Sequence, residues 1–378
     1  MRDKGSSGNN PFGGCRFLFF GLAIALVVSV FGENVYASAA PNDELKERPE
    51  LDAGKVIIDH VLDAYDWHLA DYGDIHISIP LPVILMYEGR WYFFFSHKFH
   101  HGKYAYKGFR IASEGPKKGK IIRVLDDGVT PDPNASFLLD ISITKNVLSI
   151  IIASVLLCWL LITVAKSYTH CGPHRAPRGI SAFLEPLILF VRNDIVRSAI
   201  PEQHVDKFMP YLLTLFFFIF FNNLLGLVPF FPGGANVTGS ISVTLTLALF
   251  SFVTLHLFAN REYWKHIFNT PGVPVWLKLP IPLMPLIELV GVFIKPIVLT
   301  LRLFANITAG HMIILGFVSL IFVAGSSSIL MGYALSPLTI IFIIFMNFIE
   351  LLVAFIQAFV FTFFSAIFFG MAVPDEHH

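Results

Sequence analysis

Long apolar stretches separated by short polar ones occupy the last two thirds of the chain and predict a helical membrane domain. Residues 147–165 carry no charged side chain, which is enough for one helix to cross a hydrocarbon core of about 30 Å. Residues 208–260 also lack formal charge, and Pro229 to Gly234 divide them into two spans joined by a tight loop. The pattern predicts about five transmembrane helices, near residues 147–165, 208–230, 237–260, 279–324 and 335–371.

Two helical stretches depart from simple perpendicular crossings. The apolar block 279–324 is far longer than one crossing needs, and its prolines at 282, 285 and 296 predict a bent or steeply tilted helix. Residues 180–205 alternate apolar with charged positions, which predicts an amphipathic helix on the membrane surface.

Residues 40–140 differ in character, with mixed charge and frequent proline and glycine. The apolar runs 82–87 and 91–95 flank the turn sequence Glu88-Gly89-Arg90, a pattern that predicts a β-hairpin. We therefore expect a small N-terminal β-rich domain before the membrane domain of residues 141–373.

The first residues resemble an export signal. Basic residues precede the apolar run 17–31, and Ala37-Ser38-Ala39 is a small-x-small cleavage sequence. We predict a cleaved signal peptide over residues 1–39, with an uncleaved first membrane helix as the alternative. In both cases the domain of residues 40–140 is extracytoplasmic.

Charge between the spans predicts the orientation. Lys166, Arg175 and Arg178 follow the first span, and Arg261 and Lys265 follow the third, so both segments are expected on the cytoplasmic side. Five crossings then leave the acidic, histidine-tailed C-terminus in the cytoplasm.

Composition agrees with a membrane protein, since 55% of the residues are hydrophobic and only 14% are charged. The 27 basic residues balance the 27 acidic ones, so no net charge indicates a nucleic-acid partner. The three cysteines show neither disulfide nor metal-ligand spacing, and we expect no metal and no cofactor.

The candidate chemistry lies in the last two apolar blocks. Between Lys295 and Asp375 only Arg302 and Glu350 are formally charged, and His311 is the only histidine. Ionisable side chains at bilayer depth are costly and are by default functional candidates. Arg302 is a permanent cation, whereas Glu350 and His311 can take up and release protons.

Helix geometry relates these residues to one another. Asn306 shares a face with Arg302, and Gln357 shares one with Glu350. If the two helices are antiparallel with Arg302 level with Gln357, then His311 and Glu350 fall about 13 and 10 Å further outward, at a shared depth. On a continuous helix, Glu288 lies about 21 Å to the cytoplasmic side of Arg302.

The segment Lys295-Pro296-Ile297-Val298-Leu299-Thr300-Leu301-Arg302-Leu303-Phe304-Ala305-Asn306-Ile307-Thr308-Ala309-Gly310-His311 resembles the signature helix of the ATP synthase subunit a family. Matching segments also run from Phe221 to Pro229, which includes Asn223, and from Glu350 to Phe361. The resemblance covers roughly residues 141–373.

The resemblance implies a proton-translocating stator subunit that couples ion flow to ATP synthesis. In that family the arginine, here Arg302, faces a rotor ring of c subunits that each carry one membrane carboxylic acid. It separates two half-channels, with Asn306 and Gln357 as polar neighbours and Glu288 toward the cytoplasmic exit. His311 and Glu350 match the outer half-channel pair.

The same resemblance implies further partners and one departure. The partners are the b subunits of the peripheral stalk, the rest of the ATP synthase and the lipid bilayer of a bacterial inner membrane. Some family members carry glutamate at the position of His311 and histidine at the position of Glu350, so the two types are exchanged here. An alternative role for three polar residues is to join helices through hydrogen bonds; they are Asn223, Asn306 and Gln357.

Other classes remain as alternatives. A secondary ion-coupled transporter would also bury charges, but it would need broken helices around a midplane site and often a repeated half. No nucleotide-binding Gly-x-x-x-x-Gly-Lys-Ser/Thr loop or hydrolase motif is present, so the chain is not expected to be an enzyme by itself. Sodium in place of the proton is the other alternative.

Overall fold

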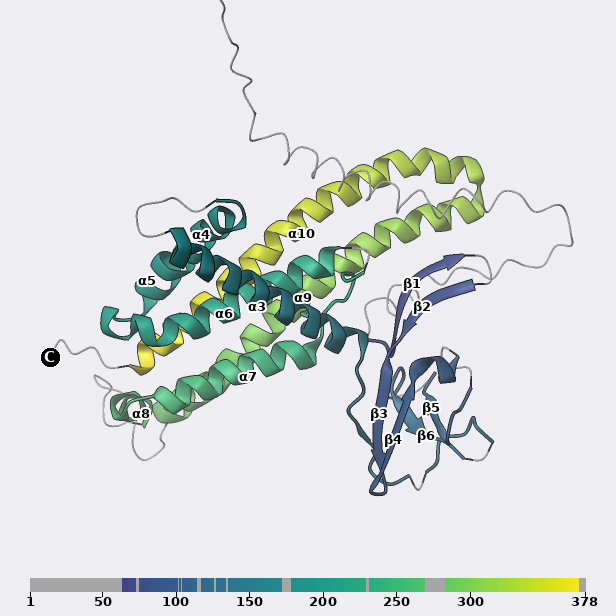
Figure 1. Ribbon diagram of the computed structural model, residues 1–378, viewed down its shortest axis with the longest axis horizontal. Coiled ribbons are helices and arrows are strands. Elements are labelled where there is room, and N and C mark those ends of the chain that lie inside the picture. The colour runs from purple at the N-terminus through teal and green to yellow at the C-terminus, as the bar shows by residue number, and fades with distance from the viewer. Residues whose placement is uncertain are drawn as a thin grey trace, which may run out of the picture. The chain divides into compact units, whose positions relative to one another are not determined.

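The structure, a computed structural model, describes residues 63–72, 75–100, 102, 104–113, 117–125, 127–133, 135–171, 178–228, 231–268 and 283–373. The predicted signal peptide lies outside these residues. The described part begins with short strands and continues as a mostly helical membrane domain (Figure 1).

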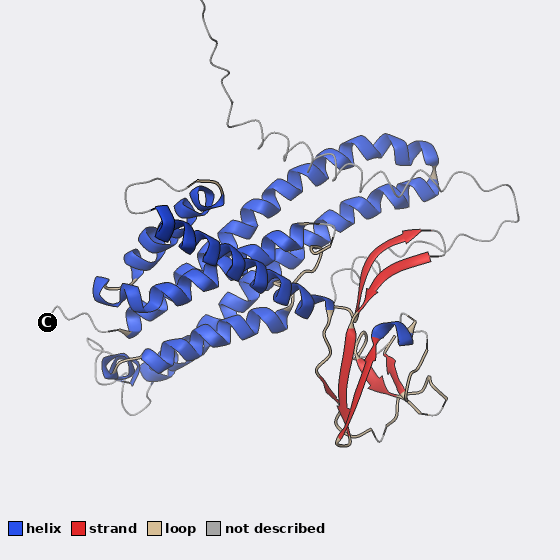
Figure 2. Cartoon of the chain, in the orientation of Figure 1, coloured by secondary structure: helices blue, strands red, loops and turns tan. Residues whose placement is uncertain are grey.

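In the part of the N-terminal region that the structure describes, the strands form three small antiparallel sheets (Figure 2). β1 (Asp66–Tyr72) pairs with β2 (Ile75–Pro80), and β5 (Phe109–Ile111) pairs with β6 (Ile121–Arg123). β3 (Pro82–Tyr87) lies between β4 (Arg90–Phe95) and β7 (Leu139–Asp140), and the 3₁₀ turn η1 (Ser96–Phe99) follows β4. The predicted β-rich domain is present.

The hairpin predicted around Glu88 and Gly89 is confirmed. Tyr87 pairs with Arg90, and the two turn residues have φ values of 51° and 74°. Positive φ at both central positions is what a two-residue turn needs to match the twist of its strands. The alternate residues of β3 are buried, so this hairpin carries one side of the domain core.

Among the described residues, five helices are long and apolar enough to cross a membrane. They are α3 (Lys145–Cys171), α6 (Glu202–Leu227), α7 (Ile241–Phe258), α9 (Leu283–Ser327) and α10 (Ile329–Ala372). The short helix α8 (Arg261–Phe268) follows α7. The chain is therefore a multi-pass membrane protein.

The predicted surface helix is divided into shorter pieces. The structure has α4 (Ile180–Phe190), a π-helical segment η2 (Val191–Val196) and α5 (Arg197–Ala199). Pro186 lies inside α4, and Pro201 stands directly before α6. Pro201 disfavours helical backbone at Ile200, which is extended and ends the helical run before α6 begins.

The helices α9 and α10 form a long antiparallel hairpin that carries most of the candidate residues (Figure 1). α9 is continuous over 45 residues, or about 68 Å, which exceeds a perpendicular crossing. At the turn, a Cβ on Gly332 would lie 2.9 Å from the Gly325 Cα, so the close approach of the two helices there requires glycine. Buried phenylalanines of α6 and α10 fill the core against α9.

Candidate functional site

The closest contact between titratable side chains of α9 and α10 in the described chain joins His311 to Glu350. His311 Nδ1 lies 2.6 Å from Glu350 Oε1, and Glu350 is only 3% exposed. The shared depth predicted from helical rise is therefore found. The same Nδ1 also lies 3.1 Å from the Ile307 carbonyl, one turn earlier in α9.

The other imidazole nitrogen is held by a third helix. His311 Nε2 lies 3.3 Å from the carbonyl oxygen of Gly226, near the end of α6. Both nitrogens thus face acceptors, and an imidazole can satisfy both only when it is charged or when Glu350 carries the proton. The 2.6 Å distance brings Nδ1 within reach of the carboxylate for the passage of one proton. Within the described chain neither Glu350 oxygen has a hydrogen-bond partner, so the carboxylate is free to take up or give up that proton. The part of Gly226 was not predicted, because a backbone carbonyl leaves no signal in the sequence.

Glycine at position 310 makes room for this pair. A Cβ there would stand 2.7 Å from Glu350 Oε1 and 3.1 Å from its carboxyl carbon, closer than side chains approach one another. Gly310 lies in the segment of α9 that resembles the family, but its packing role was not predicted.

Arg302 rests against an aromatic ring. Its guanidinium carbon lies 5.0 Å from the centre of the Phe364 ring of α10, within cation–π distance. Two turns earlier on the same face of α9, Lys295 Nζ lies 4.9 Å from the centre of the Phe368 ring. Neither ring was predicted, since a phenylalanine-rich helix carries no sign of which rings meet a cation.

Asn306 and Gln357 differ from each other in their surroundings. Asn306 is exposed on α9, whereas Gln357 is buried in α10 at 6% exposure. Within the described chain, no hydrogen bond joins either amide to Arg302. The structure therefore places them near the arginine along the hairpin without linking them to it.

Asn223 links three segments. Its Nδ2 donates to the Ala354 carbonyl of α10 at 3.1 Å, and its Oδ1 accepts from the Thr238 hydroxyl at 2.6 Å. The residue is 2% exposed. Both ends of the amide are thus used in joining α6 to α10 and to the loop before α7, which matches its helix-joining alternative.

Glu288 lies half-buried in the first turns of α9, close enough to Tyr263 of α8 for its charge to act on the tyrosine. Burial chiefly, and the nearby Glu288 charge secondly, raise the pKa of Tyr263. Since α9 is continuous, Glu288 is about 21 Å from Arg302 along the helix.

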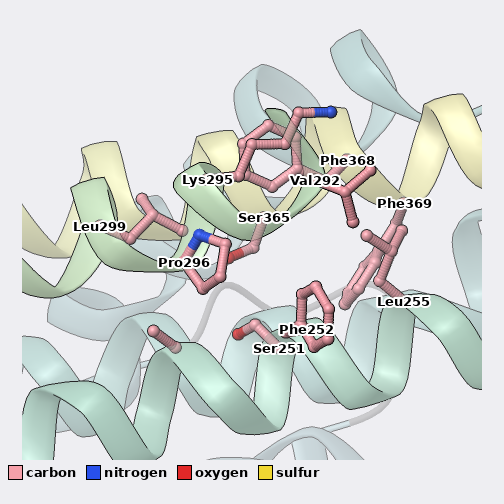
Figure 3. Close-up of a pocket in the computed structure, with 11 residues that line it drawn as sticks. Ser251, Phe252, Leu255, Val292, Lys295, Pro296, Leu299, Ser365, Phe368 and Phe369 are labelled. Carbon is pink, nitrogen blue, oxygen red and sulfur yellow. The ribbon is translucent and has the colours of Figure 1, made fainter. Parts of the chain in front are cut away.

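A small pocket lies between α7, α9 and α10, on the side of Arg302 toward Glu288 (Figure 3). Its lining is mostly apolar, with the hydroxyls of Ser251 and Ser365 and the Lys295 side chain as its polar members. Figure 3 shows the Lys295 ammonium group at the edge of the pocket, next to Phe368.

Comparison with known proteins matches two regions of the chain to two families. Residues 147–370 match the family described as ATP synthase A chain. Residues 56–141 match a separate family described as a domain of unknown function (DUF8433).

Curated relatives carry the same description. The chain is 34% identical to ATP synthase subunit a of Chlorobium phaeobacteroides over 92% of this chain and 83% of that protein. It is 38% identical to ATP synthase subunit a of Chloroherpeton thalassium over 63% of this chain and 69% of that protein. It is 43% identical to ATP synthase subunit a 2 of Chlorobaculum tepidum over 63% of this chain and 66% of that protein. The chain therefore belongs to the ATP synthase A chain family, as the non-catalytic, proton-translocating stator subunit in the membrane sector of an ATP synthase.

Proposed function

We propose that protons reach and leave the rotor through two half-channels that end on opposite sides of Arg302. The outer one passes through His311 and Glu350, and the inner one passes Glu288. The observation that carries this proposal is the buried 2.6 Å contact between His311 and Glu350, nine residues along α9 from the fixed cation.

The outer pair has the chemistry of a relay. A carboxylate and an imidazole in direct contact can exchange one proton without a net change in the charge of the pair. The burial of Glu350 limits this exchange to groups that reach it inside the protein. His311 is partly exposed, so it is the member that connects the pair to its surroundings.

Arg302 acts as the barrier between the two paths. A guanidinium keeps its proton, so it attracts a carboxylate but cannot relay protons. Its side of α9 also exposes Ala305, Asn306 and Ala309, small or polar residues that allow a partner helix to approach closely. We place the ring of c subunits against this side of α9. The exposed Asn306 would then face the ring, whereas the buried Gln357 would stabilise the hairpin of α9 and α10.

The inner path is placed at the start of α9. Glu288 is half-buried near Tyr263, and Lys295 lies two turns further toward Arg302 on the same face. Glu288 can exchange protons, and Lys295 is a cation between it and Arg302. This order favours an inner half-channel that ends before it reaches Arg302.

The orientation and the remaining partners complete the proposal. Basic residues after α3 and after α7 favour the cytoplasm for those segments, which leaves the β-rich domain outside and the C-terminus inside. The proposal includes the b subunits of the peripheral stalk as partners and a bacterial inner membrane as the location, and membership of the family supports both. The signal peptide of residues 1–39 remains part of this proposal.

ATP-driven proton pumping in inverted vesicles with the assembled complex tests the role of Arg302. Arg302→Ala is expected to abolish pumping while the complex still assembles, because no fixed charge then separates the half-channels. Arg261→Ala, at an exposed arginine of α8, is the matched control and should pump normally. Normal pumping by Arg302→Ala would contradict the proposal and favour a transporter-like path.

A further inference from the structure

A tryptophan of the N-terminal domain is buried against the membrane domain. Trp67 of β1 is 3% exposed, and its buried neighbours are Ala235 and Val237, each 1% exposed, in the loop between α6 and α7. The Phe231 ring of the same loop meets the indole edge-on, with 5.2 Å between the ring centres. The domain thus holds this loop through one large side chain.

The same loop lies close to His311 and to the turn of α9 that precedes it. A Cβ on Gly226 would lie 3.5 Å from the Ala235 carbonyl oxygen and 3.8 Å from His311 Nε2, so these three groups meet at one point. Thr308, three residues before His311, donates to the Gly239 carbonyl at 3.3 Å. The Gly234 amide donates to the Leu225 carbonyl at 3.2 Å.

The Gly226 carbonyl competes with the Ile307 carbonyl, which lies 3.1 Å from Nδ1, for the hydrogen of a neutral His311. As the acceptor for Nε2, it favours the tautomer in which Nε2 carries the hydrogen, and the charged imidazole keeps that hydrogen as well. Nδ1 is then the nitrogen that gains and loses a proton, and Nδ1 is the one that faces Glu350. Without this acceptor, a neutral imidazole could keep its proton on Nδ1, where it cannot accept one from Glu350.

Charged groups around His311 are few. Glu350 faces it from α10, and residues 208–260, which include α6, the loop and α7, contain no aspartate, glutamate, lysine or arginine. The histidine and tyrosine of this stretch, His256 and Tyr211, lie toward the opposite ends of α7 and α6 from the loop. A pH effect at His311 therefore reports on its pair with Glu350 and on its hydrogen bonds.

We propose that Trp67 is a positioning residue of the proton path: it holds the loop of residues 231–240 against α6 and α9, so that the Gly226 carbonyl keeps His311 in the tautomer that exchanges protons with Glu350. The N-terminal domain of residues 63–140 thereby takes part in proton entry. The inference rests on the proposed outer half-channel.

The test is ATP synthesis driven by an acid–base transition in proteoliposomes that contain the whole complex, over a series of pH values on the side of the N-terminal domain. Trp67→Ala is expected to lower the rate about 10-fold. The reason is that a loop that is no longer held moves the Gly226 carbonyl away from His311, and small misplacements of reacting groups slow proton transfer. It should also move the alkaline limb of the pH profile to lower pH, because the imidazolium form loses one acceptor.

Three matched variants make the result specific. Trp67→Phe, which still fills the site with an aromatic ring, should restore most of the rate and the wild-type profile. Trp91→Ala removes a tryptophan that is 52% exposed on β4 of the same domain, and it should leave rate and profile unchanged. If Trp67→Ala does not assemble, Phe231→Ala should give a smaller shift in the same direction, because that ring is 43% exposed.

The outcomes separate this inference from the proposed function. An unshifted profile for Trp67→Ala, or for Phe231→Ala where the first variant does not assemble, overturns the inference even if the rate falls. Glu350→Gln is measured in parallel. Loss of synthesis in Glu350→Gln together with a wild-type profile in Trp67→Ala rejects only the role of Trp67, whereas normal synthesis in Glu350→Gln rejects the outer half-channel itself.

Discussion

His311 Nδ1 on α9 lies 2.6 Å from Glu350 Oε1 on α10, so an imidazole and a buried carboxylate share one site between two antiparallel helices. The sequence resemblance implies that some family members carry these two residue types in exchanged positions. If the chemistry belongs to the pair and not to each position, then exchanging both residues should be tolerated better than losing either one.

We predict that the double variant His311→Glu with Glu350→His retains a measurable part of ATP-driven pumping. His311→Gln and Glu350→Gln alone should each lower pumping at least about 10-fold, because an amide cannot pass a proton on. The exchange should not be fully neutral, since a carboxylate at position 311 would face the Gly226 carbonyl, another acceptor. Equal loss in all three variants would show that the order of the two groups matters.

Gly310→Ala is predicted to impair pumping without a charge change. The added methyl group would stand 2.7 Å from Glu350 Oε1, so the carboxylate must move away from His311. The control is Gly316→Ala on the same helix, where a Cβ meets nothing within 4 Å. Fluorescence-quench assays of pumping should show a several-fold fall for Gly310→Ala alone. Similar rates for the two variants would mean that the pair adjusts around the methyl group.

Phe364→Leu is predicted to slow pumping without abolishing it. The ring lies 5.0 Å from the Arg302 guanidinium, and a cation–π contact contributes about 0.5–2 kcal/mol depending on how far it is desolvated. Phe342→Leu is the control, because that ring of α10 stacks on Phe317 of α9, about four turns of helix beyond Arg302. A fall of roughly 2- to 30-fold for Phe364→Leu alone corresponds to this range. Complete loss would indicate that the ring does more than hold the cation.

Tyr65 of the N-terminal domain gives a pH prediction. Its pKa is raised, first by burial and then by the hydrogen bond from its hydroxyl to Asp140. The neutral phenol is thus favoured in the folded domain, so its contribution is complete below the unfolded pKa of about 10 and is lost as pH rises above it.

The measurement is the thermal midpoint of the N-terminal domain within the complex, followed by tryptophan fluorescence at increasing alkaline pH. Tyr65→Phe should remove part of the alkaline fall seen in the wild type. Tyr104→Phe, at a tyrosine that is 63% exposed, should retain all of that fall. An identical alkaline fall in the three proteins would contradict the assignment to Tyr65.

Much of the helical frame and the depth of the candidate residues could be predicted from the sequence. Uncharged runs of membrane length identify spans, and the fixed rise per residue places His311 and Glu350 level once the helices are taken as antiparallel. The hairpin at Glu88 and Gly89 was also predictable, because its turn type requires particular residues. These features depend on local pattern alone.

Contacts between segments were not predictable in the same way. The ring under Arg302, the carbonyl that faces His311 and the loop that covers Trp67 depend on the rotation and crossing of helices, which apolar periodicity leaves open. The π-helical segment η2 was missed because nothing in its composition differs from that of an ordinary helix. Asn223 was placed in the proton path by its motif, and only the structure reveals that both ends of its amide are already bonded.

The last prediction separates these two roles of Asn223. Asn223→Leu would leave the Ala354 carbonyl and the Thr238 hydroxyl without their partner, which costs about 1–3 kcal/mol for buried polar groups. The thermal midpoint of the purified complex should therefore fall. Asn347→Leu is the control, because that amide bonds only to the Ile343 carbonyl of its own helix and its loss should change the midpoint little. If Asn223→Leu keeps the wild-type midpoint but pumps slowly, the amide belongs to the proton path, and the joint between α6 and α10 must depend on the apolar packing around it.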